Sequence, residues 1–272
     1  MKNLFDYATK ELSQDAFLRW LFENYNCKNN TVKKACEKLL GSLLGLEDFN
    51  IEKVSDLKTY SQWKKVDILI RFKYDDLAFC LAIEDKTFSE EHEQLENYNN
   101  SLQEYTEWLK DYYKCFTVVR KNIYYKTAKL SPEEIVRVEN QKWEIFDIDK
   151  IYKVFHLYGN TGNDILDDYI THITTIYLAC HTTEKPSLSE SNIDFLKWTS
   201  YFNNVIVPKL SQKGYQADVW KAGQYPYICL SIKKHGFLEK SPFVEIRSRD
   251  CLDNNFVARI LLYGVERNEV KF

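Results

Sequence analysis

The chain has 272 residues, of which 44% are hydrophobic and 28% are charged, and its formal net charge at pH 7 is −3. So large an apolar share can offset the entropy cost of ordering by burial, which excludes a disordered protein and leaves one large domain or two modest ones. No apolar run approaches the ~20 residues that span a bilayer, and residues 1–10 lack a signal-peptide stretch. We therefore expect a cytoplasmic protein without a membrane contact.

The first elements of the chain are predicted to be helices. Apolar residues recur at helical spacing from Glu11 to Glu23, which predicts an amphipathic helix with one buried stripe. The stripe consists of Leu12, Phe17, Leu18, Leu21 and Phe22. A second helix is expected from Thr31, which can act as its N-cap, to Leu44, where Gly41 and Gly45 weaken the pattern.

Strands are expected from Asn50 onward, where the period of the pattern changes to two. Three extended segments follow, at residues 49–57, 65–72 and 77–84. A turn at residues 74–76 joins the last two as a hairpin. A helix over residues 89–110 and a strand over residues 115–120 complete the order helix, strands, helix, strand.

The second half of the chain is predicted to form a separate α+β region. The pattern breaks at residues 159–163 and again at residues 181–191, and either break can mark a boundary. We place the domains at residues 1–158 and 159–272. The elements expected in the second half are a helix at residues 193–210 and strands at residues 215–220, 227–232, 243–247 and 257–263.

Two acidic residues stand in the apolar strands of the predicted hairpin. Asp67 lies in the run from Val66 to Ile70, and Glu84 ends the run that begins at Leu81. Because a tight turn joins the two strands, their ends can be neighbours. Paired carboxylates bind Mg²⁺ well, and the metal lowers the pKa of its water and neutralises charge on a reacting phosphate. The pair therefore predicts a metal site for phosphodiester hydrolysis.

Lys86 is predicted to share this site. Alternation along a strand puts Glu84 and Lys86 on one side and Asp85 on the other. An ammonium at that position can orient or deprotonate the attacking water and stabilise the charge of the transition state. The same acid-x-Lys spacing recurs at Asp56/Lys58 and at Glu269/Lys271, but neither copy has a carboxylate on an apolar strand one hairpin upstream.

Structural interpretations of the same residues stay open. Asp67 can cap its strand or pair with Lys65. Glu84 and Lys86 can form a surface salt bridge, which is worth ~0–1 kcal/mol and does not explain an acid at the end of so apolar a strand. We therefore favour the metal site. The seven cysteines include no CxxC spacing, which favours reduced thiols in the core over a disulfide framework or a zinc site.

At these residues the chain resembles the PD-(D/E)xK nuclease superfamily. Asp67 followed by Glu84-Asp85-Lys86 matches its signature acid and acid-x-Lys elements, although Val66 stands where the family has proline. The resemblance covers the first half of the chain and looks closest to prokaryotic and phage-associated members with a RecB-like QxxxY motif. It implies an α/β (α+β) fold, with a restriction-endonuclease-like core in which helices flank a central mixed sheet, followed by the C-terminal α+β region.

The resemblance also implies further site residues. The run from Glu11 to Leu18 is similar to the first-helix acidic motif, which implies a metal contact for Glu11, although the helix dipole alone favours a first-turn glutamate. Gln94 and Tyr98 form a QxxxY pattern on one helical face, where Tyr98 can equally be a core residue. The implied metal ligands, for Mg²⁺ or Mn²⁺, are Glu11, Asp67, Glu84 and the main-chain carbonyl of Asp85.

The resemblance implies a nucleic-acid substrate, and we expect DNA, in DNA processing or defence. Between Glu84 and Lys110 the chain has eight acids and two bases, so a polyanion should approach by another face. Two other functions stay open: a nuclease-fold binding or regulatory module without turnover, and a toxin-like effector paired with an inhibitor. A protein partner or a homodimer is compatible with the sequence. His92 is expected to face solvent.

Overall fold

The structure, a computed structural model, describes residues 3–7, 11–87, 94–186, 192–221, 228–234, 243–247 and 257–261. The chain separates into two compact units, residues 1–177 and 178–272. This division falls near the end of helix α7 (Asp164–Cys180), which packs on the first unit, and the domain limits at residues 158 and 159 stay a prediction. The Tyr169 ring of α7 stacks on Phe17 with centroids 3.6 Å apart, and its hydroxyl is 2.9 Å from that of Tyr125.

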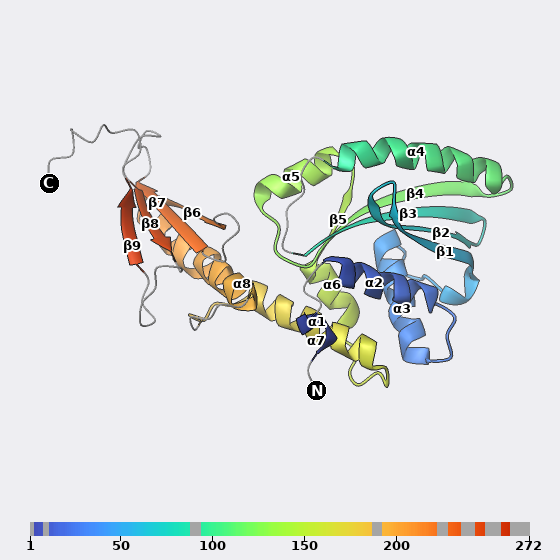
Figure 1. Ribbon diagram of the computed structural model, residues 1–272, viewed down its shortest axis with the longest axis horizontal. Helices are drawn as coiled ribbons and strands as arrows, with labels where there is room; N and C mark the ends of the chain where they lie inside the picture. Colours follow the sequence, from blue (N-terminus) through green and yellow to red (C-terminus); the bar gives the residue numbers. More distant parts are fainter. Residues whose placement is uncertain are drawn as a thin grey trace. The chain divides into compact units, whose positions relative to one another are not determined.

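A five-stranded mixed sheet forms the centre of the first unit (Figure 1). Its strands, in spatial order, are β1 (Val54–Trp63), β2 (Val66–Tyr74), β3 (Leu77–Lys86), β4 (Thr117–Lys126) and β5 (Glu144–Asp147). The first three are antiparallel, whereas β3, β4 and β5 run parallel. β3 is buried along nearly its whole length, as expected of an apolar strand between two neighbours.

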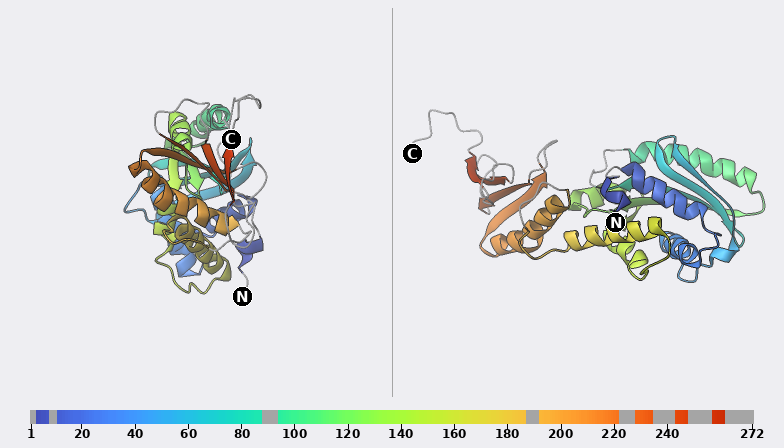
Figure 2. Two further views of the ribbon diagram at one scale, coloured as in Figure 1. Left: turned by 90° about the vertical axis from the view of Figure 1, so that its left-hand side faces the viewer. Right: turned by 60° about the horizontal axis from the view of Figure 1, so that its bottom comes forward.

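Helices cover both faces of this sheet (Figures 1 and 2). The helices described in this unit are α1 (Leu4–Tyr7), α2 (Glu11–Glu23), α3 (Asn30–Leu44), α4 (Leu95–Tyr112), α5 (Pro132–Asn140), α6 (Ile148–Phe155) and α7. Cys80 and Ala82 of β3 share a core with Leu102 of α4, so the even-numbered positions of β3 face α4. The predicted α/β class with a restriction-endonuclease-like core is confirmed. No helix in the described ranges combines the length and apolar character needed to cross a membrane.

Helix α3 shows why its boundaries fall where they do. Its N-cap is Asn29, whose side-chain oxygen accepts hydrogen bonds from the backbone N–H groups of Thr31 and Val32 at 3.0 and 3.1 Å, so the prediction of Thr31 as the cap was wrong. The helix ends at Leu44, and its C-cap is Gly45, which takes the left-handed conformation with φ 70°. A Cβ on the buried Gly41 would stand 2.9 Å from the Cβ of Phe49, so this close approach requires glycine.

Two predicted strands have different limits in the structure. Residues 51–53 form a 3₁₀ turn (η1, Ile51–Lys53), because the Asn50 side chain accepts from the N–H of Glu52 and caps it. The first strand therefore begins at Val54 rather than at Phe49. β4 continues six residues beyond the predicted end at Arg120, to Lys126, because β3 pairs with it along its whole length. The hairpin turn after Tyr74 is confirmed, with Asp75 at φ 51°.

The second unit contains helices followed by an antiparallel sheet. Its elements are α8 (Asn192–Tyr201), the π-helical turn η2 (Phe202–Ile206), α9 (Val207–Gln212), β6 (Tyr215–Lys221), β7 (Ile228–Lys234), β8 (Phe243–Arg247) and β9 (Val257–Leu261). The four strands pair in sequence order. The predicted helix and all four predicted strands are confirmed, with limits shifted by up to two residues.

Candidate active site

Asp67 and Glu84 lie side by side on adjacent strands. The antiparallel register of β2 and β3 pairs Ile68 with Ile83. Asp67 precedes Ile68 and Glu84 follows Ile83, so the two acids stand opposite each other. Asp67 Oδ2 accepts from the backbone N–H of Asp85 at 2.9 Å, and its Oδ1 accepts from Gln62 Nε2 at 2.8 Å. Both oxygens of Asp67 are therefore held in a fixed orientation next to Glu84.

Glu84 is 1% exposed, and its two carboxylate oxygens have different surroundings. Oε1 is 2.7 Å from Lys86 Nζ, whereas the buried Oε2 has no hydrogen-bond donor among the described residues. Burial and the negative charge of Asp67 raise the pKa of the Glu84 carboxyl to about 8, although the Lys86 ammonium acts in the opposite direction. The surroundings of the Glu84 carboxylate therefore hold too little positive charge to compensate both acids.

This charge deficit fits a divalent cation. A buried oxygen without a donor costs about 1–3 kcal/mol, and a cation beside it would remove both that cost and the repulsion between Asp67 and Glu84. Across the described ranges no group of three or more histidine, cysteine, aspartate or glutamate side chains could hold a metal. The donors present are thus two carboxylates, the hard oxygen ligands that Mg²⁺ and Mn²⁺ accept.

Lys86 faces Glu84, as the alternation of the strand predicted. Its side chain is 10% exposed and lies on the α4 side of the sheet. Asp85 points to the opposite side, where its Oδ1 accepts from Gln14 Nε2 of α2. That contact attaches α2 to the end of β3, so the first helix is held at the strand that carries Glu84 and Lys86.

Three residues that the sequence analysis missed extend this cluster. Lys126 is the Cα partner of Lys86 across the parallel strands β3 and β4, and Tyr124 is the partner of Glu84. Glu134 of α5 binds both, because its Oε1 is 3.2 Å from Lys126 Nζ and accepts from the Tyr124 hydroxyl. The ion pair is buried, with side chains 2% and 1% exposed. The alternation of Tyr124 and Lys126 could have revealed these residues. It was not used because the predicted strand ended at Arg120.

The sequence of the first unit matches a known protein family. The profile of the PD-(D/E)XK nuclease superfamily matches residues 2–163, more than half of the chain. The chain belongs to this superfamily. Its members are generally nucleases that use divalent metal ions. No curated protein and no solved structure matched the chain.

The other residues suggested by the superfamily motifs are less closely defined. Gln94 is exposed and directly precedes α4. Tyr98 is 6% exposed and contacts the Trp143 ring, with centroids 6.4 Å apart, in the core that covers the Glu84 side of the sheet. Glu11 begins α2, but its side chain lies outside the description, as does the whole of His92. Site roles for Glu11, Gln94 and Tyr98 stay predictions.

Proposed function

We propose that the chain is a cytoplasmic, Mg²⁺-dependent nuclease that hydrolyses phosphodiester bonds of DNA. The observation that carries the proposal is the buried pair of carboxylates, Asp67 and Glu84, with Lys86 beside it and a Glu84 oxygen that lacks a donor among the described residues. Superfamily membership supports a nucleic-acid substrate.

Asp67 and Glu84 would hold the cation, with Glu11 and the main-chain carbonyl of Asp85 as further candidate ligands. When bound, the metal supplies Lewis-acid stabilisation of phosphate charge and lowers the pKa of water. The fixed orientation of Asp67, which accepts from the backbone of Asp85 and from Gln62, keeps the ligand oxygens in place before substrate arrives.

Lys86 would act on the water and the phosphate. Its Nζ is held 2.7 Å from Glu84 Oε1, so the ammonium is positioned before the reaction and needs little reorganisation. In that position it can orient the attacking water and donate to a phosphate oxygen as negative charge develops. Gln94 and Tyr98 are the proposed substrate contacts on the same side of the sheet.

The test is cleavage of labelled single- and double-stranded DNA with Mg²⁺, Mn²⁺ or EDTA. We expect Lys86→Met, which keeps the apolar stem, to lower the rate about 10²-fold or more. The matched control is Lys110→Met, which removes an exposed lysine that pairs with Glu107 at 2.8 Å on α4. Equal rates for wild type and Lys86→Met, with circular dichroism showing both folded, would remove Lys86 from the mechanism.

A second experiment separates this proposal from a binding module without turnover. Calorimetry should detect Mg²⁺ or Mn²⁺ binding to wild type and its loss in the double variant Asp67→Asn/Glu84→Gln. Tight DNA association without metal binding or cleavage would instead favour the binding module. RNA of the same sequence, tested in parallel, decides whether the substrate is DNA.

A further inference from the structure

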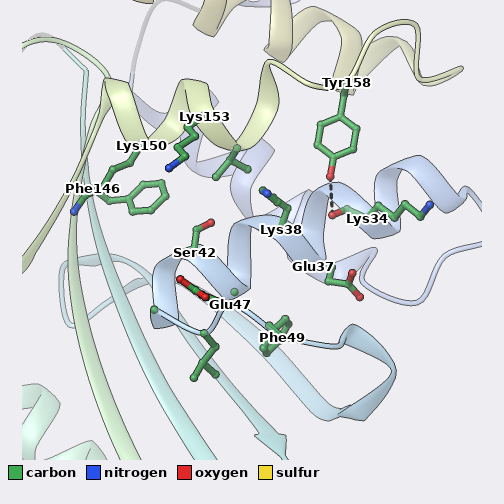
Figure 3. A pocket seen from close by; sticks show the side chains of 14 residues that line it. Lys34, Glu37, Lys38, Ser42, Glu47, Phe49, Phe146, Lys150, Lys153 and Tyr158 are labelled. Atoms are coloured by element: carbon green, nitrogen blue, oxygen red, sulfur yellow. Dashed lines mark hydrogen bonds between the residues drawn. The ribbon is translucent and has the colours of Figure 1, made fainter.

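A cavity of about 650 Å³ lies between α3 and α6 in the first unit (Figure 3). Its volume falls within the range of about 300–1,000 Å³ that is typical of small-molecule sites. It lies on the side of the sheet away from α4, whereas Glu84 and Lys86 face α4. The cavity is therefore separate from the candidate active site.

The lining of this cavity is positively charged although the whole chain is acidic. Lys34 and Lys38 come from α3, and Lys150 and Lys153 come from α6, against two glutamates in the lining. Four positive and two negative side chains give the lining a formal charge of +2, whereas the whole chain has −3. Like charges that face each other across a gap repel, so an anion between the two helices would stabilise this arrangement.

Some of these charged groups already have partners in the protein. Glu37 Oε2 accepts from the backbone N–H of Ile51 at 2.9 Å, which fixes that carboxylate at the start of the 3₁₀ turn. Lys150 Nζ donates to the carbonyl of Ile145. Glu47 is exposed and supplies the other negative charge of the lining.

Lys38 and Lys153 are the charges still available to a ligand. Neither forms an ion pair or a side-chain hydrogen bond with any other residue that the structure describes. Figure 3 shows both side chains reaching into the space between the helices, on the side where the Ser42 hydroxyl lies, whereas Lys34 extends away from them. Two ammonium groups and a hydroxyl are suitable donors for phosphate oxygens.

Aromatic side chains form the apolar part of the cavity. Phe49 and Phe146 are 7% and 2% exposed and line it from different sides. Tyr158 forms part of the wall, where its hydroxyl donates to the carbonyl of Lys34 at 3.0 Å and joins the segment after α6 to α3. A lining of basic and aromatic side chains suits a ligand with an anionic end and an apolar body.

We infer that this cavity binds a phosphate-bearing small molecule of nucleotide size, with Lys38 and Lys153 contacting its phosphate groups and Ser42 donating a further hydrogen bond. The volume of about 650 Å³ and the bridge from Tyr158 to α3 favour a small ligand over a long strand. The inference goes beyond the proposed nuclease activity and does not depend on it.

Isothermal calorimetry of the full chain in EDTA tests the site, with pyrophosphate, AMP and ADP as probes. We expect ADP to bind more tightly than AMP because it carries more negative charge, and we expect both to weaken as salt rises. Each of the substitutions Lys38→Gln and Lys153→Gln should weaken ADP binding by about tenfold or more, and the double variant combines both losses. Without ligand, the double variant should unfold at the same temperature as wild type or higher, because it loses a repulsion.

Two variants control this experiment. Lys114→Gln removes an exposed lysine outside the cavity and should leave ADP binding unchanged. Lys86→Met should also leave it unchanged, because Lys86 lies on the other side of the sheet. Since the titrations contain EDTA and measure no cleavage, failure of the nuclease proposal would not alter this result.

Three outcomes would overturn the inference. The first is that no probe binds at millimolar concentration. The second is that wild type and the folded double variant bind ADP with equal affinity. The third is that binding of a twelve-nucleotide strand depends on Lys38 and Lys153 whereas binding of ADP does not. The last outcome would make the cavity part of a surface for nucleic-acid strands.

Discussion

Two buried charged clusters lie on the α4 side of the sheet, and they differ in how well their charges are matched. The first surrounds Arg71, which is 3% exposed and pairs with Asp56 at 3.2 Å. The Tyr113 hydroxyl contacts both members of the pair, and the Tyr60 hydroxyl is 3.2 Å from Arg71 Nε. The Tyr112 ring lies 4.8 Å from the guanidinium. This cluster has one positive and one negative charge, with several neutral partners.

The second cluster is formed by Asp67 of β2 with Glu84 and Lys86 of β3, and it has two carboxylates for the single ammonium of Lys86. Its Glu84 Oε2 has no donor in the described part of the chain. Burial of charge is tolerated where hydrogen bonds and opposite charge compensate it, as around Arg71. The uncompensated cluster is therefore the one suited to a ligand, and the compensated cluster stabilises the fold. Variants in the two clusters should have opposite consequences.

The largest effect should come from Glu84→Gln. The substitution keeps the shape of the side chain but removes a metal-binding charge, so we expect kcat for DNA cleavage to fall about 10³-fold or more. In EDTA the variant should be at least as stable as wild type, because it relieves repulsion with Asp67. Urea unfolding monitored by circular dichroism, beside the cleavage assay, checks both; a strong loss of stability would instead make Glu84 structural.

Arg71→Met should have the reverse effect. Loss of the guanidinium leaves Asp56 with the Tyr113 hydroxyl but without an opposite charge, so we expect the free energy of unfolding to fall by about 3–5 kcal/mol. Cleavage per folded molecule should change little. Lys110→Met, which breaks a pair that is half exposed, should cost at most about 0.5 kcal/mol. Full stability of Arg71→Met would contradict the structural role of this cluster.

The stability contributed by the Glu84 cluster should also depend on pH. The pKa of Glu84 is raised to about 8, so between its ordinary value and pH 8 the folded protein holds a proton that the unfolded chain has released. In EDTA, the stability of wild type should therefore decrease as pH rises through that window, relative to Glu84→Gln. Mg²⁺ should reduce the difference, because it stabilises the ionised carboxylate. Parallel pH profiles for the two proteins in EDTA would contradict this.

The smallest effect should come from Gln62→Ala. Gln62 Nε2 donates to Asp67 Oδ1 at an exposed position, so its loss should weaken Mn²⁺ binding by up to about tenfold with little change in melting temperature. Calorimetric titration with Mn²⁺ measures it. Unchanged metal affinity would show that the backbone N–H of Asp85 is sufficient to orient Asp67.

The two acid-x-Lys copies show how far local sequence could separate these clusters. Asp56 and Lys58 have the same spacing as Glu84 and Lys86, but no acidic residue stands in an apolar strand one hairpin upstream of them. The sequence did not predict that Asp56 pairs with Arg71, because their side chains meet only through strand pairing, and β1 has an irregular register between Ser55 and Lys58. The copy at Glu269 lies outside the described residues.

The sequence by itself determined the α/β class, the hairpin of β2 and β3, and the placement of Glu84 and Lys86 on one face, because these follow from local periodicity and turn residues. Tertiary structure decided the rest. Long-range pairing extended β4 and brought Lys126 beside Lys86, and α5 supplied Glu134 as its partner. Helix packing assembled the lysines of the cavity from α3 and α6. Contacts between segments far apart in the chain have no local period, so only folding brings these residues together.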